Sequence, residues 1–436
     1  MTKALCVLVA FGLGVAAQDR ATVSGSIAER TGLQVRPEAA ASEFKTGSFP
    51  PGLKFTGRIS REDAVAIALW NSSALQATLK DLGLAQADLM DAGLLRNPSF
   101  QALLPIAGKP FEFVLQWPVE ILWQRPRRLA AARANLSQVG QTLIQAGLDV
   151  VRDARLAHAE LALAERRSEA ASQAQRLRRR IAELTQKRLD VGDVSAFEAN
   201  QARVDLNLMQ ETAQRLARDA DAARERLRMT IGLRGTTERL VAAEASVDAQ
   251  APSEMDALLK TAMESRPDLR AAELAVETAM RNARWERSKV YAAVTPLLSI
   301  KETGTPTKTR TGPGLQAELP ILNRNQGRIK RADVEVERAA LLYLAARDRV
   351  EAEVREARVQ LVQALESLEY LRSQVRPPVE EAIRLAEKAY AQGDVAFLSV
   401  LEAGRQVYDL ELREADAAAS FQRARARLEH GIGRRL

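Results

Sequence analysis

The chain has 436 residues, a formal net charge of +7 and only 4% aromatic residues. So few large side chains cannot fill the thick cores of ordinary globular domains, whereas abundant Ala, Leu, Arg, Glu and Gln are typical of long helices and coiled coils. Charges of both signs are interspersed and the basic runs contain no aromatic residues, which argues against a nucleic-acid-binding protein.

Residues 1–17 have the pattern of an export signal. Lys3 supplies the basic start, residues 4–15 are apolar, and small residues precede Gln18. The apolar run is too short for a membrane-spanning helix, and no other run in the sequence reaches that length. Cys6, the only cysteine, lies inside this segment, so we expect a mature chain without cysteine.

Residues 18–58 contain Gly, Pro, Ser and Thr without periodicity, which predicts an extended N-terminal segment. A helix is expected to begin after Ser60, because Asp63 follows it at the spacing of a capping box. This helix is expected to pause near residues 71–73 and to stop before Pro98.

Two pairs of short segments, at 98–119 and at 296–321, predict β-hairpins. Each segment has partial alternation, for example apolar Leu315 and Ala317 on either side of Gln316. This length and period are typical of tilted membrane strands with one face toward lipid and one toward a polar lumen. A small soluble hairpin is the alternative. Four strands cannot close a barrel, so a membrane role requires oligomerisation.

Long helices are expected to follow each hairpin. The first runs over about 127–191, roughly 100 Å, and returns over 195–231. The second runs over 327–392 and returns over 396–432. Two apolar heptad rows over 336–375 predict coiled-coil packing, and Pro377–Pro378 is expected to interrupt this helix, with a belt of irregular structure there.

The chain repeats itself. Gly192-Asp193-Val194 recurs as Gly393-Asp394-Val395, 201 positions later, and the helix and hairpin patterns recur in the same order. We therefore expect two structural repeats, at 59–250 and at 251–436, packed about a pseudo-axis. The tips of the helical hairpins are expected at 191–194 and 392–395.

Catalytic constellations are hard to find. The sequence contains two histidines, His158 and His430, and the expected mature chain has no cysteine, so a His/Cys metal site cannot be assembled. No phosphate-binding glycine loop or nucleophile elbow occurs. We expect neither an enzyme nor a cofactor.

Together these segments resemble the outer-membrane efflux protein family, the TolC-like outer-membrane factors. The resemblance covers about 59–433 and rests on Asp63–Asn71 followed by Asn97-Pro98, on 319–322 leading into 325–328, and on the two Gly-Asp-Val turns. It implies a mainly α fold in which a homotrimer forms a twelve-stranded barrel in the outer membrane of a Gram-negative bacterium and a periplasmic tunnel of helices. It also implies an exit duct joined to a periplasmic adaptor and an inner-membrane transporter.

The resemblance assigns adaptor docking to the helix tips. The residues concerned are Val191, Gly192, Asp193, Gln392, Gly393 and Asp394. The alternative is that each Gly ends one helix and each Asp caps the next.

An entrance gate is the other implied site. Family members often carry Asp-Val-Leu-Asp just after the second tip, where this chain has Ser399-Val400-Leu401-Glu402. In the first copy Glu198 stands where Ser399 stands in the second. Three copies of Glu402 around an axis form an acidic ring that favours cations, although the missing first acid departs from the family pattern. For both Glu198 and Glu402 the alternative is an exposed helix charge paired with a basic neighbour.

The Asn-Pro and Leu-Pro-Ile-Leu segments look more like the heavy-metal (cobalt-zinc-cadmium) efflux branch than the drug-efflux branch. Two other interpretations of function stay open at this point. The first is a periplasmic coiled-coil scaffold without a pore, and the second is the outer-membrane component of a type I protein secretion system.

Overall fold

The computed structural model describes most of the chain: residues 19–37, 47–53, 57–104, 111–117, 119, 121–235, 239–243, 253–290, 294–303, 308–318 and 320–436. The expected export signal at 1–17 and the two hairpin turns lie outside the described residues.

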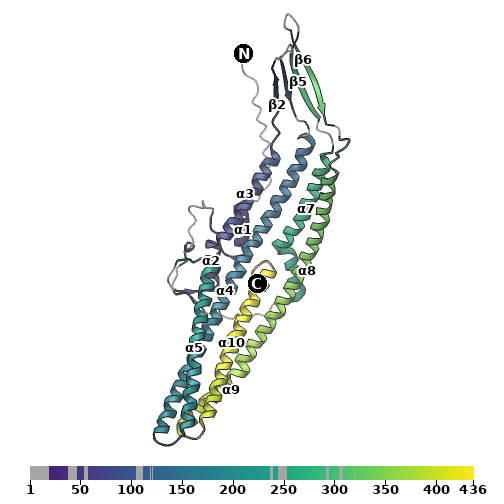
Figure 1. Cartoon of the computed structure of the whole chain (residues 1–436). Coiled ribbons are helices and arrows are strands. Elements are labelled where there is room, and N and C mark those ends of the chain that lie inside the picture. The colour runs from purple at the N-terminus through teal and green to yellow at the C-terminus, as the bar shows by residue number, and fades with distance from the viewer. Residues whose placement is uncertain are drawn as a thin grey trace. The chain divides into compact units, whose positions relative to one another are not determined.

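The elements of the two halves follow the same order (Figure 1). After an initial helix α1 (Arg20–Thr31), the first half contains β1 (Arg58–Ile59), α2 (Arg61–Asn71), α3 (Ser73–Gly93), β2 (Ser99–Leu103), β3 (Glu112–Gln116), α4 (Ile121–Asp190) and α5 (Ala196–Thr230). The second half contains β4 (Val241–Ala242), α6 (Met255–Ser265), α7 (Pro267–Ser288), β5 (Val294–Thr303), β6 (Lys308–Ala317), α8 (Gln326–Tyr370), a π-helical segment (Leu371–Val375), α9 (Arg376–Gln392) and α10 (Phe397–Gly431).

The chain divides into two compact units. One unit comprises 79–141 and 274–337 with residues 19–26, and holds the four-stranded sheet with the adjoining parts of α3, α4, α7 and α8. The other comprises 27–78, 142–273 and 338–436, and holds the two helical hairpins α4–α5 and α9–α10.

The sheet has the strand order β2-β3-β5-β6, and all three pairings are antiparallel. Its register places Phe100 opposite Leu115, Leu115 opposite Leu298, and Leu298 opposite Pro313. Directly opposed residues share a face and side chains alternate along a strand. One face is therefore apolar over most of its length, with Thr311, Thr309 and Glu302 toward the far end of β5 and β6. Its apolar residues are Phe100, Ala102, Phe113, Leu115, Val294, Pro296, Leu298, Ile300, Pro313, Leu315 and Ala317.

The opposite face is mostly polar and hydrogen-bonded. The Ser99 hydroxyl donates to Gln116 Oε1 at 3.1 Å, Gln116 Nε2 donates to Gln316 Oε1 at 3.0 Å, and the Ser299 hydroxyl donates to Glu112 Oε1 at 2.9 Å. Its apolar exceptions are Leu103, Val114 and Leu297. The expected strands are therefore confirmed, although they are shorter than 98–119 in the first hairpin and begin at 294 and end at 317 in the second.

The capping box predicted for α2 is present. The Ser60 hydroxyl accepts from the Asp63 N–H at 3.1 Å, and Asp63 Oδ2 accepts from the Ser60 N–H at 3.2 Å. These two bonds satisfy donors that the first helical turn leaves free.

The expectation of an extended segment at 18–58 is wrong for 20–31, which form α1. Asp19 Oδ1 accepts from the Thr22 N–H at 2.8 Å, as an N-cap residue does. Val23, Ile27 and Thr31 are buried at the spacing of one helix face. The segment is rich in Ser, Thr and Gly, so this narrow buried face was not recognised as a helical pattern in the sequence. The expectation is also wrong for 58–59, which form β1 and pair in parallel with β4.

The long helices match their predicted ranges, except that α4 begins at Ile121 rather than near 127. Pro126 stands in its second turn. The heptad prediction for α8 is confirmed by its central residues Val350, Val354 and Leu361, which are at most 3% exposed and pack in a cluster with Phe421 of α10.

Pro377–Pro378 interrupts the second long helix, as predicted, but the interruption is the π-helical segment rather than irregular structure. The two prolines occupy the first turn of α9, where a missing N–H costs little. The Arg376 N–H donates to the Leu371 carbonyl, five residues back, so the wider turn absorbs the break.

The two return helices end in the same way. Gly232 follows α5 and Gly433 follows α10, both with φ +71° and 201 positions apart. Each lies against the break between the preceding helices of its own half: Gly232 against Asn71, and Gly433 against Ser265. Among the described residues, no helix is long and apolar enough to cross a membrane.

Candidate functional site at the helix tips

The first tip is a tight turn that closes α4. Gly192 has φ +81°, and its N–H donates to the Leu189 carbonyl at 2.9 Å. The Asp193 N–H donates to the Arg188 carbonyl at 2.8 Å. This pair of bonds defines a Schellman motif, which needs a left-handed residue at the position of Gly192.

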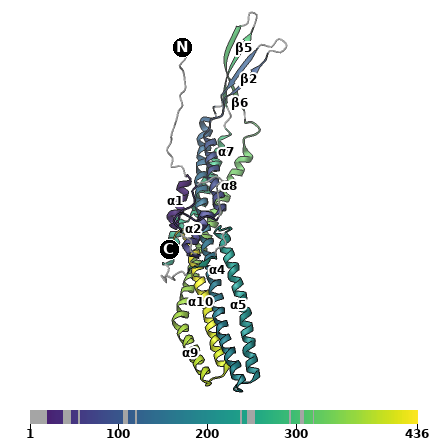
Figure 2. The same ribbon diagram turned by 90° about the vertical axis from the view of Figure 1, so that its left-hand side faces the viewer.

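The second tip has the same geometry. Gly393 has φ +86° and donates to the Tyr390 carbonyl at 3.1 Å, while the Asp394 N–H donates to the Ala389 carbonyl at 2.9 Å. In Figures 1 and 2 the two turned ends lie side by side. The prediction that each Gly ends a helix is confirmed.

The alternative that each Asp caps the following helix is wrong. The N-cap of α5 is Ser195, whose hydroxyl accepts from the Glu198 N–H at 3.2 Å. The N-cap of α10 is Ala396, which makes no side-chain cap bond. Asp193 and Asp394 therefore stand in the turns themselves, and both are exposed.

Arg188 joins the two tips. Its Nε donates to Asp193 Oδ2 at 2.5 Å, and this hydrogen bond raises the pKa of the guanidinium above its usual value. Its guanidinium carbon lies 5.1 Å from the ring centroid of Tyr390, a cation–π distance. The Tyr390 hydroxyl bonds Thr185 Oγ1 at 2.8 Å, and both side chains are buried. Sequence reasoning missed Arg188, Tyr390 and Thr185.

Beneath the tips, all four helices contribute to one apolar cluster. Ile181 comes from α4, Ala202 from α5, Tyr390 from α9, and Val400 and Leu401 from α10. Each of these residues is at most 6% exposed. Since Val400 and Leu401 form the middle of the Ser-Val-Leu-Glu stretch, the flanking Ser399 and Glu402 are left on the outside.

The predicted gate residues remain apart within one chain. Ser399 and Glu402 are exposed and Glu198 is half-buried. Within the described ranges, no ion pair involves Glu198 or Glu402, and no contact joins them. The alternative of pairing with a basic neighbour therefore finds no support within the chain, and the gate assignment stays a prediction.

An ion-pair cluster more than three turns above the tips was also missed. Asp205 of α5 accepts from Arg178 Nε of α4 at 2.7 Å and lies 3.7 Å from Arg405 of α10. Arg178 belongs to a basic run that looks like a solvated helix face in the sequence. Its 9% exposure indicates instead that it helps hold the three helices together.

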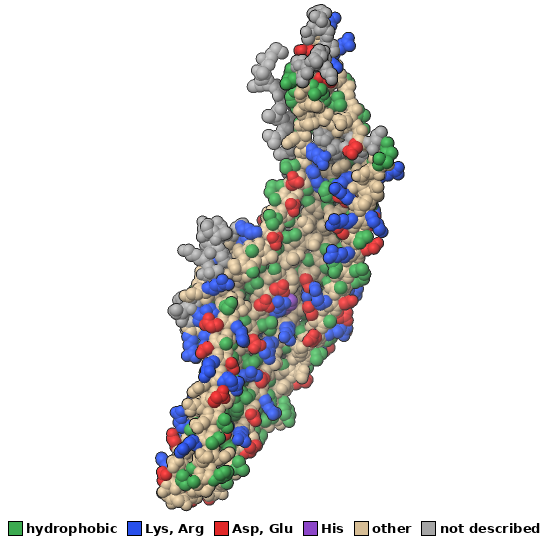
Figure 3. Space-filling model, in the orientation of Figure 1, with side chains coloured by type: hydrophobic (Ala, Val, Ile, Leu, Met, Phe, Trp, Pro, Cys, Tyr) green, Lys and Arg blue, Asp and Glu red, His purple; other side chains and the backbone are tan. Residues whose placement is uncertain are grey.

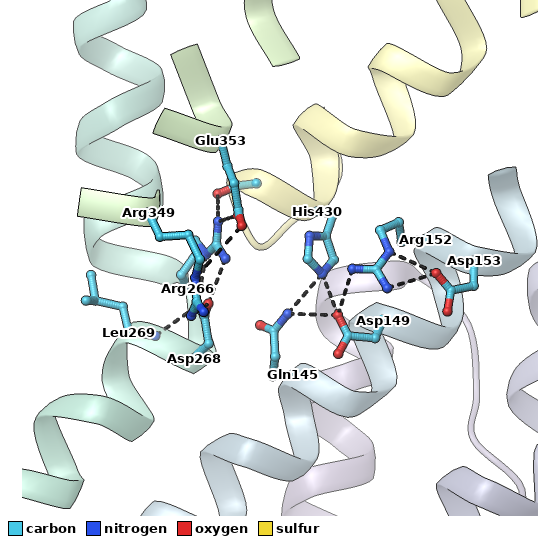
Figure 4. Close-up of polar contacts among 11 residues, drawn as sticks. Gln145, Asp149, Arg152, Asp153, Arg266, Asp268, Leu269, Arg349, Glu353 and His430 are labelled. Atoms are coloured by element: carbon cyan, nitrogen blue, oxygen red, sulfur yellow. Dashed lines mark hydrogen bonds and ion pairs between the residues drawn. The ribbon is translucent and has the colours of Figure 1, made fainter. Parts of the chain in front are cut away.

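Further from the tips, buried charges fix the ends of the return helices (Figure 4). Arg266 donates to Asp268 at 2.6 Å and to Glu353 at 2.6 Å. Burial raises the pKa of Asp268, but the hydrogen bond and charge of Arg266 outweigh it and leave that pKa below its usual value. His430 Nε2 bonds Asp149 Oδ1 at 2.7 Å, and there too the partner outweighs burial and lowers the carboxyl pKa.

Comparison with known proteins adds independent findings. Residues 258–434 match the family model described as outer membrane efflux protein. The chain is 24% identical over 407 residues to the cobalt-zinc-cadmium resistance protein CzcC of Cupriavidus metallidurans, covering 91% of this chain and 96% of that protein. By the match to the family model, residues 258–434 belong to the outer membrane efflux protein family.

Solved structures of this fold agree. A structure of CusC from work on transmembrane channel formation superposes with a TM-score of 0.72 at 17% identity, and the superposition covers 91% of this chain and 99% of CusC. The outer membrane protein VceC of Vibrio cholerae superposes with a TM-score of 0.69 at 17% identity, covering 86% and 96%. These likenesses show the fold.

Family membership confirms the predicted class and location. The matched family is that of outer membrane efflux proteins, and the fold is the one found in solved outer-membrane channels such as OprN. The chain is mainly helical with long helices, as predicted.

Proposed function

We propose that the chain is the exit duct of a tripartite export system and works as a homotrimer. The observation that carries this proposal is the two-faced sheet. Its apolar face suits lipid, its polar face suits a lumen, and its outer strands β2 and β6 have no neighbour on one side among the described strands.

The open edges of the four-stranded sheet require strands from other chains as partners. Backbone N–H and C=O groups that face lipid without a partner cost several kcal/mol each, so a sheet that crosses a membrane must close on itself. Four strands are too few to close around a lumen. Three chains supply twelve strands, and pairing β6 of one copy with β2 of the next leaves no edge.

The tandem repeat supports the same architecture. Equivalent glycines are 201 positions apart at both ends of the return helices, Gly192 with Gly393 and Gly232 with Gly433, with matching positive φ. We infer two repeats, at 59–250 and 251–436, so that a trimer has six similar helical hairpins around one tunnel.

We assign adaptor docking to the two tips, with residues 191–193 and 392–394 in contact with the adaptor. Their exposure and ordered turns support this role. The tips differ in charge: Asp193 is paired with Arg188, whereas Ala389 occupies the corresponding place before Asp394. Within the described residues Asp394 has no ion-pair partner, so it is the carboxylate available to a basic group of the adaptor.

The entrance gate is assigned to Glu402, Ser399 and Glu198. The exposed, unpaired carboxylate of Glu402 supports an acidic ring when three chains meet. Such a ring favours cations, and the likeness to a cobalt-zinc-cadmium resistance protein supports metal cations as the exported class. Export of proteins in a type I system is the competing assignment.

Purification from outer-membrane fractions tests the duct. We expect a detergent-stable particle of three times the chain mass that gives discrete conductances in planar bilayers, with cation preference reduced in Glu402→Gln. A monomer without conductance would contradict the proposal. Loss of resistance to cobalt, zinc or cadmium in cells lacking the protein would support the cargo class, and unchanged resistance would contradict it.

A matched pair of substitutions tests docking. Asp394→Asn removes an unpaired carboxylate and should reduce export in cells, while Asp193→Asn removes one already paired with Arg188 and should reduce it less. Trimer abundance in the membrane serves as the control for both. An equal loss of export from both variants would contradict the assigned difference between the tips.

A further inference from the structure

An open surface cavity of about 610 Å³, a volume typical of ligand pockets, lies between α4 and α7, two of the helices next to the sheet. Four arginines line it, together with the small residues Ala130 and Ser288, which leave the space open: Arg127, Arg281, Arg284 and Arg287. We call it the arginine cavity. No carboxylate is among its lining residues.

Two of the four arginines are unneutralised. Arg281 pairs with Glu277 and Arg287 pairs with Asp333 at 2.7 Å. Arg127 and Arg284 are exposed and have no hydrogen-bond or ion-pair partner in the part of the chain that the structure describes. Four positive charges against two negative ones leave an excess of two, which fits an anionic ligand.

The neighbours of Arg127 show what a structural arginine does here. Arg125 Nε donates to the Gly93 carbonyl at 2.7 Å, and Arg128 donates to the Ala92 and Leu94 carbonyls at 3.0 and 2.8 Å. Both satisfy carbonyls at the C-terminal end of α3. Arg127 has no such role, so its charge is available to a ligand.

The position of the cavity indicates the source of the anion. Arg127 is six residues into α4, and Arg281 is seven residues before the end of α7, so the cavity lies within roughly 10 Å of the helix ends that lead into the sheet. Headgroup layers occupy about 5–8 Å on each side of the hydrocarbon core. Exposed apolar residues stand where the chain passes between the strands and the helices next to the sheet: Leu94, Leu95, Trp117, Leu122, Ile321 and Leu322.

Figure 3 shows the same order on one face, with hydrophobic side chains over the sheet and Lys and Arg side chains on the helices next to it. Membrane proteins typically carry apolar residues in the bilayer core, Trp at its interface and basic residues just outside it, and the same spatial order is found here. A second copy of the chain is a poorer occupant, because α4 and α7 adjoin the inner strands β3 and β5 rather than the open strands.

We infer that the arginine cavity binds the phosphate group of an anionic phospholipid at the inner face of the outer membrane. Guanidinium groups bind phosphate oxygens through paired N–H donors, and Arg127 and Arg284 approach from two different helices. This inference rests on the proposed function, since it requires that the sheet span the membrane.

Native mass spectrometry of the purified protein in detergent tests the inference with phosphatidylglycerol, phosphatidylcholine and inorganic phosphate as separate probes. We expect bound phosphatidylglycerol to persist where phosphatidylcholine dissociates. Each removed arginine should weaken phosphatidylglycerol binding about fivefold, and Arg127→Gln/Arg284→Gln together roughly 25-fold. The control Arg331→Gln, an exposed arginine paired with Glu335 outside the cavity, should bind like the unaltered protein.

Trimer mass, helix content and conductance of each variant separate loss of the site from loss of the fold. A conducting trimer that binds both lipids equally overturns the inference and leaves the channel intact. Binding of inorganic phosphate in place of the lipid also overturns it. An altered ion selectivity in Arg284→Gln with unchanged lipid affinity assigns the arginines to the lumen and overturns it as well. Absence of trimer and conductance refutes the proposed function itself.

Discussion

Replacing one glycine at a tip and one at the opposite end of a return helix separates backbone strain from steric overlap. Both Gly393 and Gly232 have positive φ, +86° and +71°. Placing an L-residue in that region lowers the free energy of unfolding by about 1–2 kcal/mol. Alanine also restricts the unfolded chain more than glycine does, which raises the free energy of unfolding by about 0.4–1 kcal/mol. A Cβ on Gly393 meets nothing within 4 Å, so Gly393→Ala should cost about 1 kcal/mol.

The same substitution at Gly232 adds a collision. Its Cβ would lie 2.7 Å from the Asn71 Cβ and 3.1 Å from the Asn71 carbonyl oxygen. Asn71 cannot easily move, because it is 1% exposed and its amide donates to the Ser48 carbonyl at 2.9 Å. Overpacking of this kind adds about 1–3 kcal/mol.

Denaturant unfolding of the detergent-solubilised protein, followed by helical circular dichroism, measures both losses. Gly192→Ala, with φ +81° and open space, is the matched control for Gly393→Ala. Equal losses at Gly393 and Gly232 would refute the steric argument, and a loss below about 0.5 kcal/mol at both tips would refute the strain argument.

Three further predictions concern buried polar groups. Tyr390→Phe removes the buried hydrogen bond to α4 and should cost about 1 kcal/mol, with faster proteolysis at the tips as the readout. His158 is buried and donates to a backbone carbonyl, and burial lowers its pKa below 6.5. The unfolded chain therefore binds more protons than the folded chain just below pH 6.5, so the free energy of unfolding should fall as the pH drops from 6.5. Replacing the histidine in His158→Gln should flatten that slope. The control His430→Gln should leave the contribution of His158 in place. Glu429→Gln leaves the buried Arg155 without its main partner and should cost about 3–5 kcal/mol in unfolding free energy, whereas Arg155→Met/Glu429→Leu should recover most of it.

Local sequence signals predicted most of the fold. The capping box at Ser60 and the heptads of α8 act through neighbouring residues, so they can be found along the chain. The helix α1 was missed because its buried face is only a few residues wide, and the pairing of β1 with β4 because two-residue strands carry no period. The sequence predicted only a break where the π-helical segment stands. Proline lacks the N–H that an α-helical hydrogen bond needs, but it does not determine which kind of turn forms instead.

The candidate site was predicted only in part. The glycines at the tips could be predicted because a tight turn needs a residue with positive φ, and glycine is the residue type that adopts it most readily. Arg188 was missed because its partner Tyr390 lies about 200 positions away in sequence. Arg178 and Arg405 were missed because they come from distant parts of the chain and meet only at Asp205. An aromatic residue three positions before Gly393, in a chain with 4% aromatics, is the signal that could have found Tyr390.

The two halves share backbone geometry but not side-chain partners, and this difference is what a tandem channel requires. Schellman turns recur at both tips, yet Arg188 has Ala389 as its counterpart and Tyr390 has Leu189. One ring and one guanidinium therefore meet only where unlike halves adjoin. Two tips that both carried Arg and Tyr would keep this contact, but an Arg in place of Ala389 would stand to Asp394 as Arg188 stands to its partner Asp193. Divergence on a repeated backbone thus lets the first tip anchor the second while Asp394 stays without an ion-pair partner among the described residues.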